Sequence, residues 1–149
     1  MTFTKITYAV SDNIATIALN DPATMNAAGI DTATELALAF EMAADEARAT
    51  VLTGNGRGFC SGANLSGGDV SNTPVQGKPD AGKALDQWYN PLIMAMREHP
   101  HPIITAVNGA AAGVGCSIAL MGDLIVASEN AYFLQAFRRI GLVPDGGST

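Results

Sequence analysis

Short apolar segments separated by polar turns predict that strands and helices follow one another along this chain. Two β-branched segments, 6–10 and 14–19, are joined by a short polar turn, which is typical of a β-hairpin. Apolar residues then recur at helical spacing, and the helix they predict ends near Arg48. Asp31 or Thr32 can cap its first turn.

The rest of the chain continues the alternation of strands and helices. In chain order we expect strand 49–53, helix 83–98, strand 103–107, helix 113–121 and strands 124–127 and 131–134. Between the first two of these, residues 66–80 are rich in Gly, Ser and Pro and predict a long loop. Trp88 and Tyr89 are expected to pack on the second helix. Strands that alternate with helices indicate an α/β fold.

Two glycine-rich turns, 54–65 and 108–116, each follow a predicted buried strand. Glycines at such a turn bring unobstructed main-chain N–H groups to the end of the strand. Two N–H donors that converge on one point form an oxyanion hole, which is the largest catalytic contribution in many acyl-transfer enzymes. The same glycines could instead serve only tight turns and close helix–strand packing.

Composition narrows the possible functions. The chain has 149 residues, of which 48% are hydrophobic and 15% charged, so we expect one folded domain over 1–149. Its formal net charge of −6 and the lack of a basic stripe argue against nucleic acid or an anionic membrane as partners.

The cysteine and histidine spacing and the lack of targeting or membrane-span patterns predict a cytoplasmic protein without a metal. Two cysteines, Cys60 and Cys116, are a poor disulfide framework. We find no signal-peptide pattern and no apolar run of membrane-span length. His99 and His101 have no third ligand at metal spacing, so no metal site is expected.

Three motifs together resemble the crotonase superfamily, the enoyl-CoA hydratase/isomerase group. Phe59–Leu65 and Asn108–Cys116 resemble its two oxyanion segments, and Met25–Ala27 resembles its turn that contacts coenzyme A. The resemblance runs from the hairpin to Thr149 and implies a ββα spiral core without the family's C-terminal helical region, hence a fragment of a longer chain. It also implies an acyl-CoA thioester substrate, no cofactor beyond the substrate's own coenzyme A, and a homotrimer or hexamer.

Carried over residue by residue, the resemblance assigns roles at the site. The main-chain N–H groups of Ala63 and Val114 become the oxyanion donors, and Asp145 becomes a single carboxylate base. The implied substrate-binding residues are Asn26, Ala27, Ala63, Asn64, Leu65, Gly113, Val114 and Phe137. Asp21 stands where the family often has a basic residue, which removes one expected phosphate contact.

The reaction type follows from which carboxylates are present. Hydratases of the family use two glutamates, and their places hold Ser117 and Phe137 here, neither of which can act as a base. Because isomerisation needs only one base, Asp145 favours an enoyl-CoA isomerase that converts 3-enoyl-CoA to 2-enoyl-CoA.

Other interpretations of Asp145 remain open. It could be the nucleophile of an aryl-CoA dehalogenase, with Phe137 as the aromatic neighbour, or it could simply cap a following helix. The chain could also be a non-catalytic homologue that binds acyl-CoA.

Overall fold

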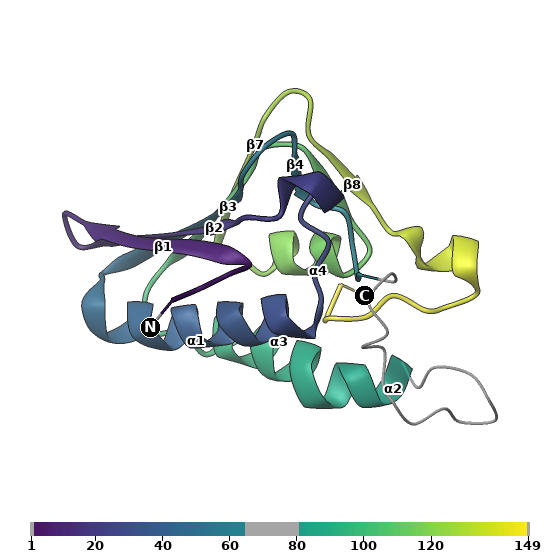
Figure 1. Ribbon diagram of the computed structural model, residues 1–149, viewed down its shortest axis with the longest axis horizontal. Helices are drawn as coiled ribbons and strands as arrows, with labels where there is room; N and C mark the ends of the chain where they lie inside the picture. Colours follow the sequence, from purple (N-terminus) through teal and green to yellow (C-terminus); the bar gives the residue numbers. More distant parts are fainter. Residues whose placement is uncertain (1, 65–80, 149) are drawn as a thin grey trace.

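The computed structural model describes residues 2–64 and 81–148. Its main sheet has five strands in the order β1-β2-β3-β5-β7 (Figure 1). These strands are β1 (Ile6–Ser11), β2 (Ile14–Leu19), β3 (Ala49–Gly54), β5 (Ile103–Val107) and β7 (Leu124–Ala127). The first two form the predicted hairpin, whose turn residues Asp12 and Asn13 both have positive φ, as a two-residue hairpin loop requires. The other pairs are parallel.

Helices cover one face of this sheet. Figure 1 shows α1 (Ile30–Glu46) and α3 (Asn90–Arg97) lying side by side below the strands. Their apolar faces meet the sheet in one core, whose largest fully buried side chains include Leu36, Phe40, Leu52 and Leu92. The predicted helix that ends near Arg48 and the strands 49–53 and 103–107 are therefore confirmed within a residue or two.

A second, three-stranded parallel sheet takes two of its strands from the glycine-rich turns. Its order is β4 (Gly58–Cys60), β6 (Ala110–Ala112) and β8 (Tyr132–Leu134), and α4 (Val114–Leu120) packs against it. The sequence predicted turns where β4 and β6 lie, because three-residue strands of small residues give no periodic signal. Because these two short strands are parallel neighbours, the residues that follow them lie close together at the same edge of the sheet.

The second predicted helix is interrupted by a wider turn. It consists of α2 (Ala81–Ala84), the π-helical turn η2 (Leu85–Tyr89) and α3. Pro91 has no N–H and its ring would collide with the carbonyl four residues earlier in a regular helix. The main-chain N–H of Asn90 instead reaches back five residues to the carbonyl of Leu85.

The α/β class agrees with the expectation from sequence. The predicted loop 66–80 lies outside the described residues.

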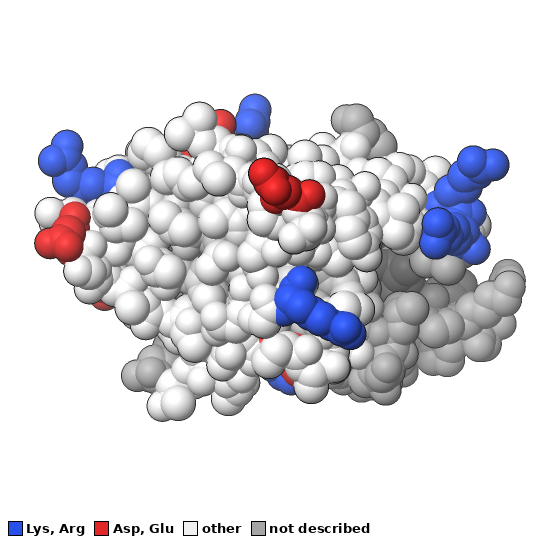
Figure 2. Space-filling model, turned by 90° about the horizontal axis from the view of Figure 1, so that it is seen from above, with Lys and Arg blue, Asp and Glu red and all other residues white. Residues whose placement is uncertain are grey.

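Figure 2 shows charged side chains thinly scattered over the face seen from above. Among the described residues, no helix is both long and apolar enough to cross a membrane.

Candidate active site

The two glycine-rich turns meet where β4 and β6 end. These strands are parallel neighbours, so their carboxyl ends share one edge of the small sheet. Gly62 and Gly113, just beyond the ends of these strands, have φ values of 113° and 53°, which residues with a side chain rarely adopt. A Cβ placed on Gly62 would lie 3.2 Å from the carbonyl oxygen of Ala112, and one on Gly113 would lie 3.8 Å from the Gly62 Cα. The turns are thus in direct contact.

Hydrogen bonds around Ala28 orient the N–H of Ala63. The Ala28 N–H donates to the Gly62 carbonyl at 2.8 Å, and the Asn64 N–H donates to the Ala28 carbonyl at 2.9 Å. This is a parallel bridge between residues 28 and 63, in which the polar groups of residue 63 point away from residue 28. Among the described residues, no group accepts a hydrogen bond from the Ala63 N–H.

Val114 supplies the matching donor on the second turn. It is the first residue of α4, directly after Gly113. The N–H groups of a helix's first turn have no partner inside the helix. No hydrogen bond from the Val114 N–H to another described residue is present either.

A pocket of about 660 Å³ lies beside these turns. Ala63, Val114 and Asp145 all line it, although they are far apart in sequence. Asn64, Gly113 and Phe137 also line it, so the structure brings together six of the predicted site residues. Apolar side chains form much of the wall, among them Leu85, Leu142, Val143 and Pro144.

Asn26 and Ala27 lie outside the lining of this pocket, and Leu65 lies outside the described residues. The Asn26 side chain is buried, accepts from the Asp21 N–H at 2.9 Å, and donates to the carbonyls of Asn55 and Gly58 at 3.0 and 2.9 Å. It therefore fastens the loop after β2 to the turn before β4. Its predicted contact with coenzyme A stays a prediction, as does that of Ala27.

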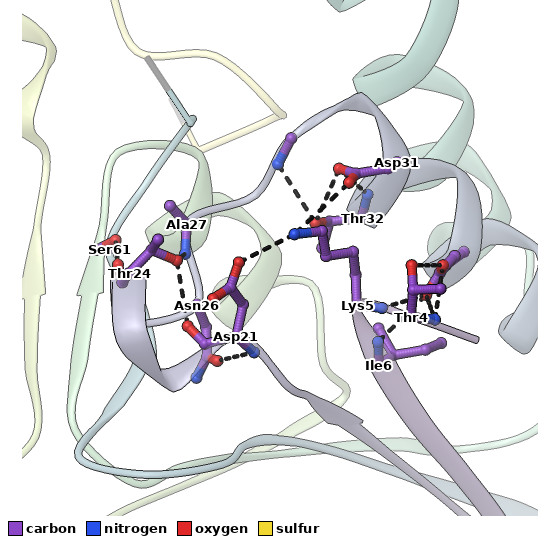
Figure 3. A network of polar contacts seen from close by, with 12 residues as sticks. Thr4, Lys5, Ile6, Asp21, Thr24, Asn26, Ala27, Asp31, Thr32 and Ser61 are labelled. Atoms are coloured by element: carbon purple, nitrogen blue, oxygen red, sulfur yellow. Dashed lines mark hydrogen bonds and ion pairs between the residues drawn. The ribbon is translucent and has the colours of Figure 1, made fainter. Parts of the chain in front are cut away.

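A polar network continues from Asp21 towards the start of α1 (Figure 3). The Lys5 ammonium lies 3.1 Å from Asp21 and 3.8 Å from Asp31. Asp31 lines the pocket, and its carboxylate also accepts from the Thr32 N–H at 2.8 Å. This carboxylate is thereby tied to a cation and to its own helix.

Asp145 presents a different environment. Its Oδ1 atom is buried and has no hydrogen-bond partner among the described residues. Burial raises the pKa of Asp145 above its ordinary value, and the Ser117 hydroxyl and the aspartate's own main-chain N–H oppose this in part. A carboxyl group with a raised pKa in an apolar pocket is suited to take up and return a proton near neutral pH.

Two further residues shape the site, and sequence reasoning did not give them these roles. The Ser117 hydroxyl donates to the main-chain oxygen of Asp145 at 2.9 Å, and the Tyr89 hydroxyl donates to that of Ala28 at 2.7 Å. Both contacts join segments distant in sequence, so no local motif marks them.

The histidines and cysteines play no visible part at the pocket. His99 meets the Thr50 hydroxyl at 3.2 Å and packs edge-on against Phe40, away from the lining. Burial raises the pKa of the Cys60 thiol to about 11, which leaves it protonated. Among the described residues, no group of three or more His, Cys, Asp or Glu side chains could hold a metal ion.

Comparisons with known proteins place this architecture. The sequence profile described as enoyl-CoA hydratase/isomerase matches residues 9–149. A "probable enoyl-CoA hydratase" of Rhodobacter capsulatus is 43% identical over 100% of this chain and 56% of the relative. The 1,2-epoxyphenylacetyl-CoA isomerase of Escherichia coli is 39% identical over 94% of this chain and 53% of the relative.

A solved structure gives the same result for the fold. The crystal structure of an enoyl-CoA hydratase from Mycobacterium avium subsp. paratuberculosis superposes with a TM-score of 0.82 and 36% identity, over 98% of this chain and 53% of that one. The chain therefore belongs to the enoyl-CoA hydratase/isomerase family of the crotonase superfamily and has its α/β fold. It spans about half the length of the curated relatives it matches.

Proposed function

We propose that the protein is an acyl-CoA isomerase that moves a double bond from 3-enoyl-CoA to 2-enoyl-CoA. The observation that carries this proposal is the buried, unpartnered Oδ1 of Asp145 in a pocket also lined by Ala63 and Val114. One carboxylate and two main-chain donors are the minimum set for an allylic proton shift through an enolate.

The reaction proceeds in two proton transfers. The Asp145 carboxylate removes a proton from C2 of the 3-enoyl thioester, and the electron pair moves onto the thioester oxygen as a dienolate. The N–H groups of Ala63 and Val114 donate to this oxygen and stabilise its negative charge. The Asp145 carboxylic acid then returns the proton to C4, which leaves the double bond between C2 and C3.

The side chains at the pocket favour isomerisation over hydration. Hydration uses a second acid or base that holds water, and Phe137 at one of the family's two positions is apolar and lines the pocket. Ser117 at the other position is buried outside the lining. The remaining lining carboxylate among the described residues, Asp31, is engaged by Lys5 and Thr32.

The dehalogenase alternative lacks a residue it would require. An aryl ester formed on Asp145 needs a base to activate water for its hydrolysis. Among the described residues that line the pocket there is no histidine, and His99 is engaged with Thr50. The E. coli relative is named an isomerase of a coenzyme A thioester, which agrees with an isomerase class for this chain.

The test compares the full-length protein with its Asp145→Asn variant on 3-enoyl-CoA, 2-enoyl-CoA and 4-halobenzoyl-CoA. We expect the wild type to isomerise 3-enoyl-CoA and the variant to lose about 100- to 10,000-fold in kcat, the usual contribution of a positioned base. Asp45→Asn is the matched control, because Asp45 is exposed on α1 and forms no hydrogen bond or ion pair with another described residue.

Three results would reject the proposal. Wild-type turnover in Asp145→Asn would remove the single-base mechanism. Halide release from 4-halobenzoyl-CoA would establish the dehalogenase instead. Acyl-CoA binding without turnover of any thioester would identify a non-catalytic homologue.

A further inference from the structure

The turn that carries Asp145 is fastened to helix α4 through one serine. Ser117 lies in the middle of α4 and is fully buried. Its hydroxyl is 2.9 Å from the main-chain oxygen of Asp145 and 3.1 Å from the hydroxyl oxygen of Ser148. The Ser117 hydroxyl is therefore within hydrogen-bond distance of two oxygen atoms on the same turn.

Ser148 closes the same turn from its other end. Its hydroxyl and its N–H lie 2.8 and 3.1 Å from the main-chain oxygen of Asp145. The Asp145 carbonyl is therefore held by a local turn and, through Ser117, by a helix 28 residues earlier in the chain. Among the described residues, the hydrogen bonds that link this turn to α4 both come from Ser117.

Close packing leaves this turn little freedom to move. Gly146 has a φ of 58°, and a Cβ placed on it would lie 2.7 Å from the Ser117 Cβ. The main chain directly after Asp145 therefore packs closely against Ser117. A gap at Ser117 would remove both the hydrogen bond and part of this contact.

We propose that Ser117 is a positioning residue that sets the distance between Asp145 and the oxyanion donor of Val114. Ser117 and Val114 belong to the same helix, three residues apart, so the hydroxyl links the base to the rigid element that begins with the donor. Ser117 does not line the pocket and acts only through Asp145. The inference rests on the isomerase function proposed above.

Loss of the Ser117 hydroxyl also changes the proton affinity of the base. The polar Ser117 hydroxyl beside Asp145 lowers the pKa of that carboxyl, so its removal raises the pKa further. The other titratable groups at the pocket are Asp31 on α1, Tyr89 on η2 and Arg139 on the 3-10 helix η3 (Ala136–Ile140), and the substitution leaves them in place.

The experiment measures the Ser117→Ala variant of the full-length protein against Thr105→Val. The Thr105 hydroxyl is also buried and donates to a carbonyl near the other end of α4, that of Ala119, at 2.7 Å. Both substitutions remove one buried hydroxyl bond at α4, but only Ser117→Ala releases Asp145.

For Ser117→Ala we expect kcat to fall about 10- to 100-fold with KM changed less than about threefold, as misplacement of a reacting group predicts. The acidic limb of its kcat/KM profile moves to higher pH. Thr105→Val keeps the wild-type profile and kcat within about twofold, because its bond does not reach the base.

Ser148→Ala is the second variant, and it keeps the test decisive if Ser117→Ala fails to fold. It removes the other hydroxyl on the Asp145 carbonyl, and we expect kcat to fall by about three- to tenfold. Wild-type kcat and pH profile in Ser117→Ala, or in folded Ser148→Ala when Ser117→Ala does not fold, would overturn the positioning role. If Asp145→Asn is inactive in that case, the isomerase proposal still stands. Wild-type turnover in Asp145→Asn would overturn both.

Discussion

The phenolic hydroxyl of Tyr89 donates a hydrogen bond of 2.7 Å to the main-chain oxygen of Ala28, on the bridge that orients Ala63. Burial, with smaller contributions from the charges of Cys60, Asp145 and Asp31, raises the pKa of Tyr89 to about 12. The hydroxyl therefore stays protonated near neutral pH and remains a donor. From the π-helical turn, Tyr89 thus supports the segment that carries the proposed oxyanion donor of Ala63.

Removal of this hydrogen bond is expected to loosen that segment. Tyr89→Phe leaves the Ala28 carbonyl with only the Asn64 N–H, and we expect a loss of about 1 kcal/mol in the free energy of unfolding. The proposed isomerase activity should fall about three- to tenfold in kcat, since the donor is held less firmly. Denaturant titration and steady-state kinetics measure the two effects.

The matched control for this change is Tyr132→Phe. Tyr132 is 55% exposed on β8, and its hydroxyl makes no hydrogen bond to another described residue. This variant should match the wild type in both assays. An unchanged unfolding free energy in Tyr89→Phe would show that the Ala28 contact contributes nothing.

A second prediction tests the donor of Val114 directly. Val114→Pro removes the N–H, and proline is tolerated at the first position of a helix because that N–H has no helical partner. We expect kcat of the proposed isomerase to fall about 100- to 1000-fold, the usual cost of one oxyanion donor. Val114→Ala keeps the N–H and should retain kcat within about threefold.

Circular dichroism must first show that Val114→Pro keeps its fold. Full activity in a folded proline variant would mean that this N–H does not contact the thioester oxygen. The role of the second glycine-rich turn would then be limited to packing.

The third prediction concerns Glu35, whose carboxylate fixes the start of β1. It accepts hydrogen bonds from the N–H groups of Thr4, Lys5 and Ile6 and from the Thr4 hydroxyl, at 2.7–3.2 Å. Burial alone would raise the pKa of Glu35, but these hydrogen bonds outweigh it and lower the pKa below its ordinary value. We expect Glu35→Gln to lose about 1–2 kcal/mol of stability at pH 7, as for hydrogen bonds to a charged group.

The pH dependence of this loss has a definite sign. A carboxylate whose pKa is lowered in the folded state stabilises the protein fully above the unfolded pKa of about 4.3, and that contribution disappears as pH falls through the folded pKa. The stability difference between wild type and Glu35→Gln should therefore shrink below about pH 4. Glu41→Gln, an exposed change on the same helix, should leave stability unchanged throughout, and a constant difference for Glu35→Gln would contradict the lowered pKa.

Most of the main sheet could be predicted from the sequence because its strands are β-branched, apolar and bounded by turns. β4 and β6 could not, since residues such as Gly58 and Ala111 have little strand propensity and pair only because the tertiary fold aligns them. The π-helical turn was signalled only by Pro91. A proline predicts that the helix is disrupted near this point, but it does not predict that the disruption is a π-helical turn.

At the candidate site, the chain positions of Ala63, Val114 and Asp145 were accessible through family resemblance, and the structure lines one pocket with all three. From the sequence, Ser117 was recognised only as the residue that replaces a glutamate of the family's hydratases. Its contact with Asp145 depends on the turn at Gly146 folding onto α4, which no local pattern encodes.

Because the proposed oxyanion hole consists of main-chain N–H groups, it does not depend on which residues with a free N–H stand at positions 63 and 114. Evolution can therefore exchange the acids and bases around it, one residue at a time, while the means of holding an activated thioester is preserved. A scaffold of this kind can diversify its reactions without first losing its capacity to stabilise the common intermediate.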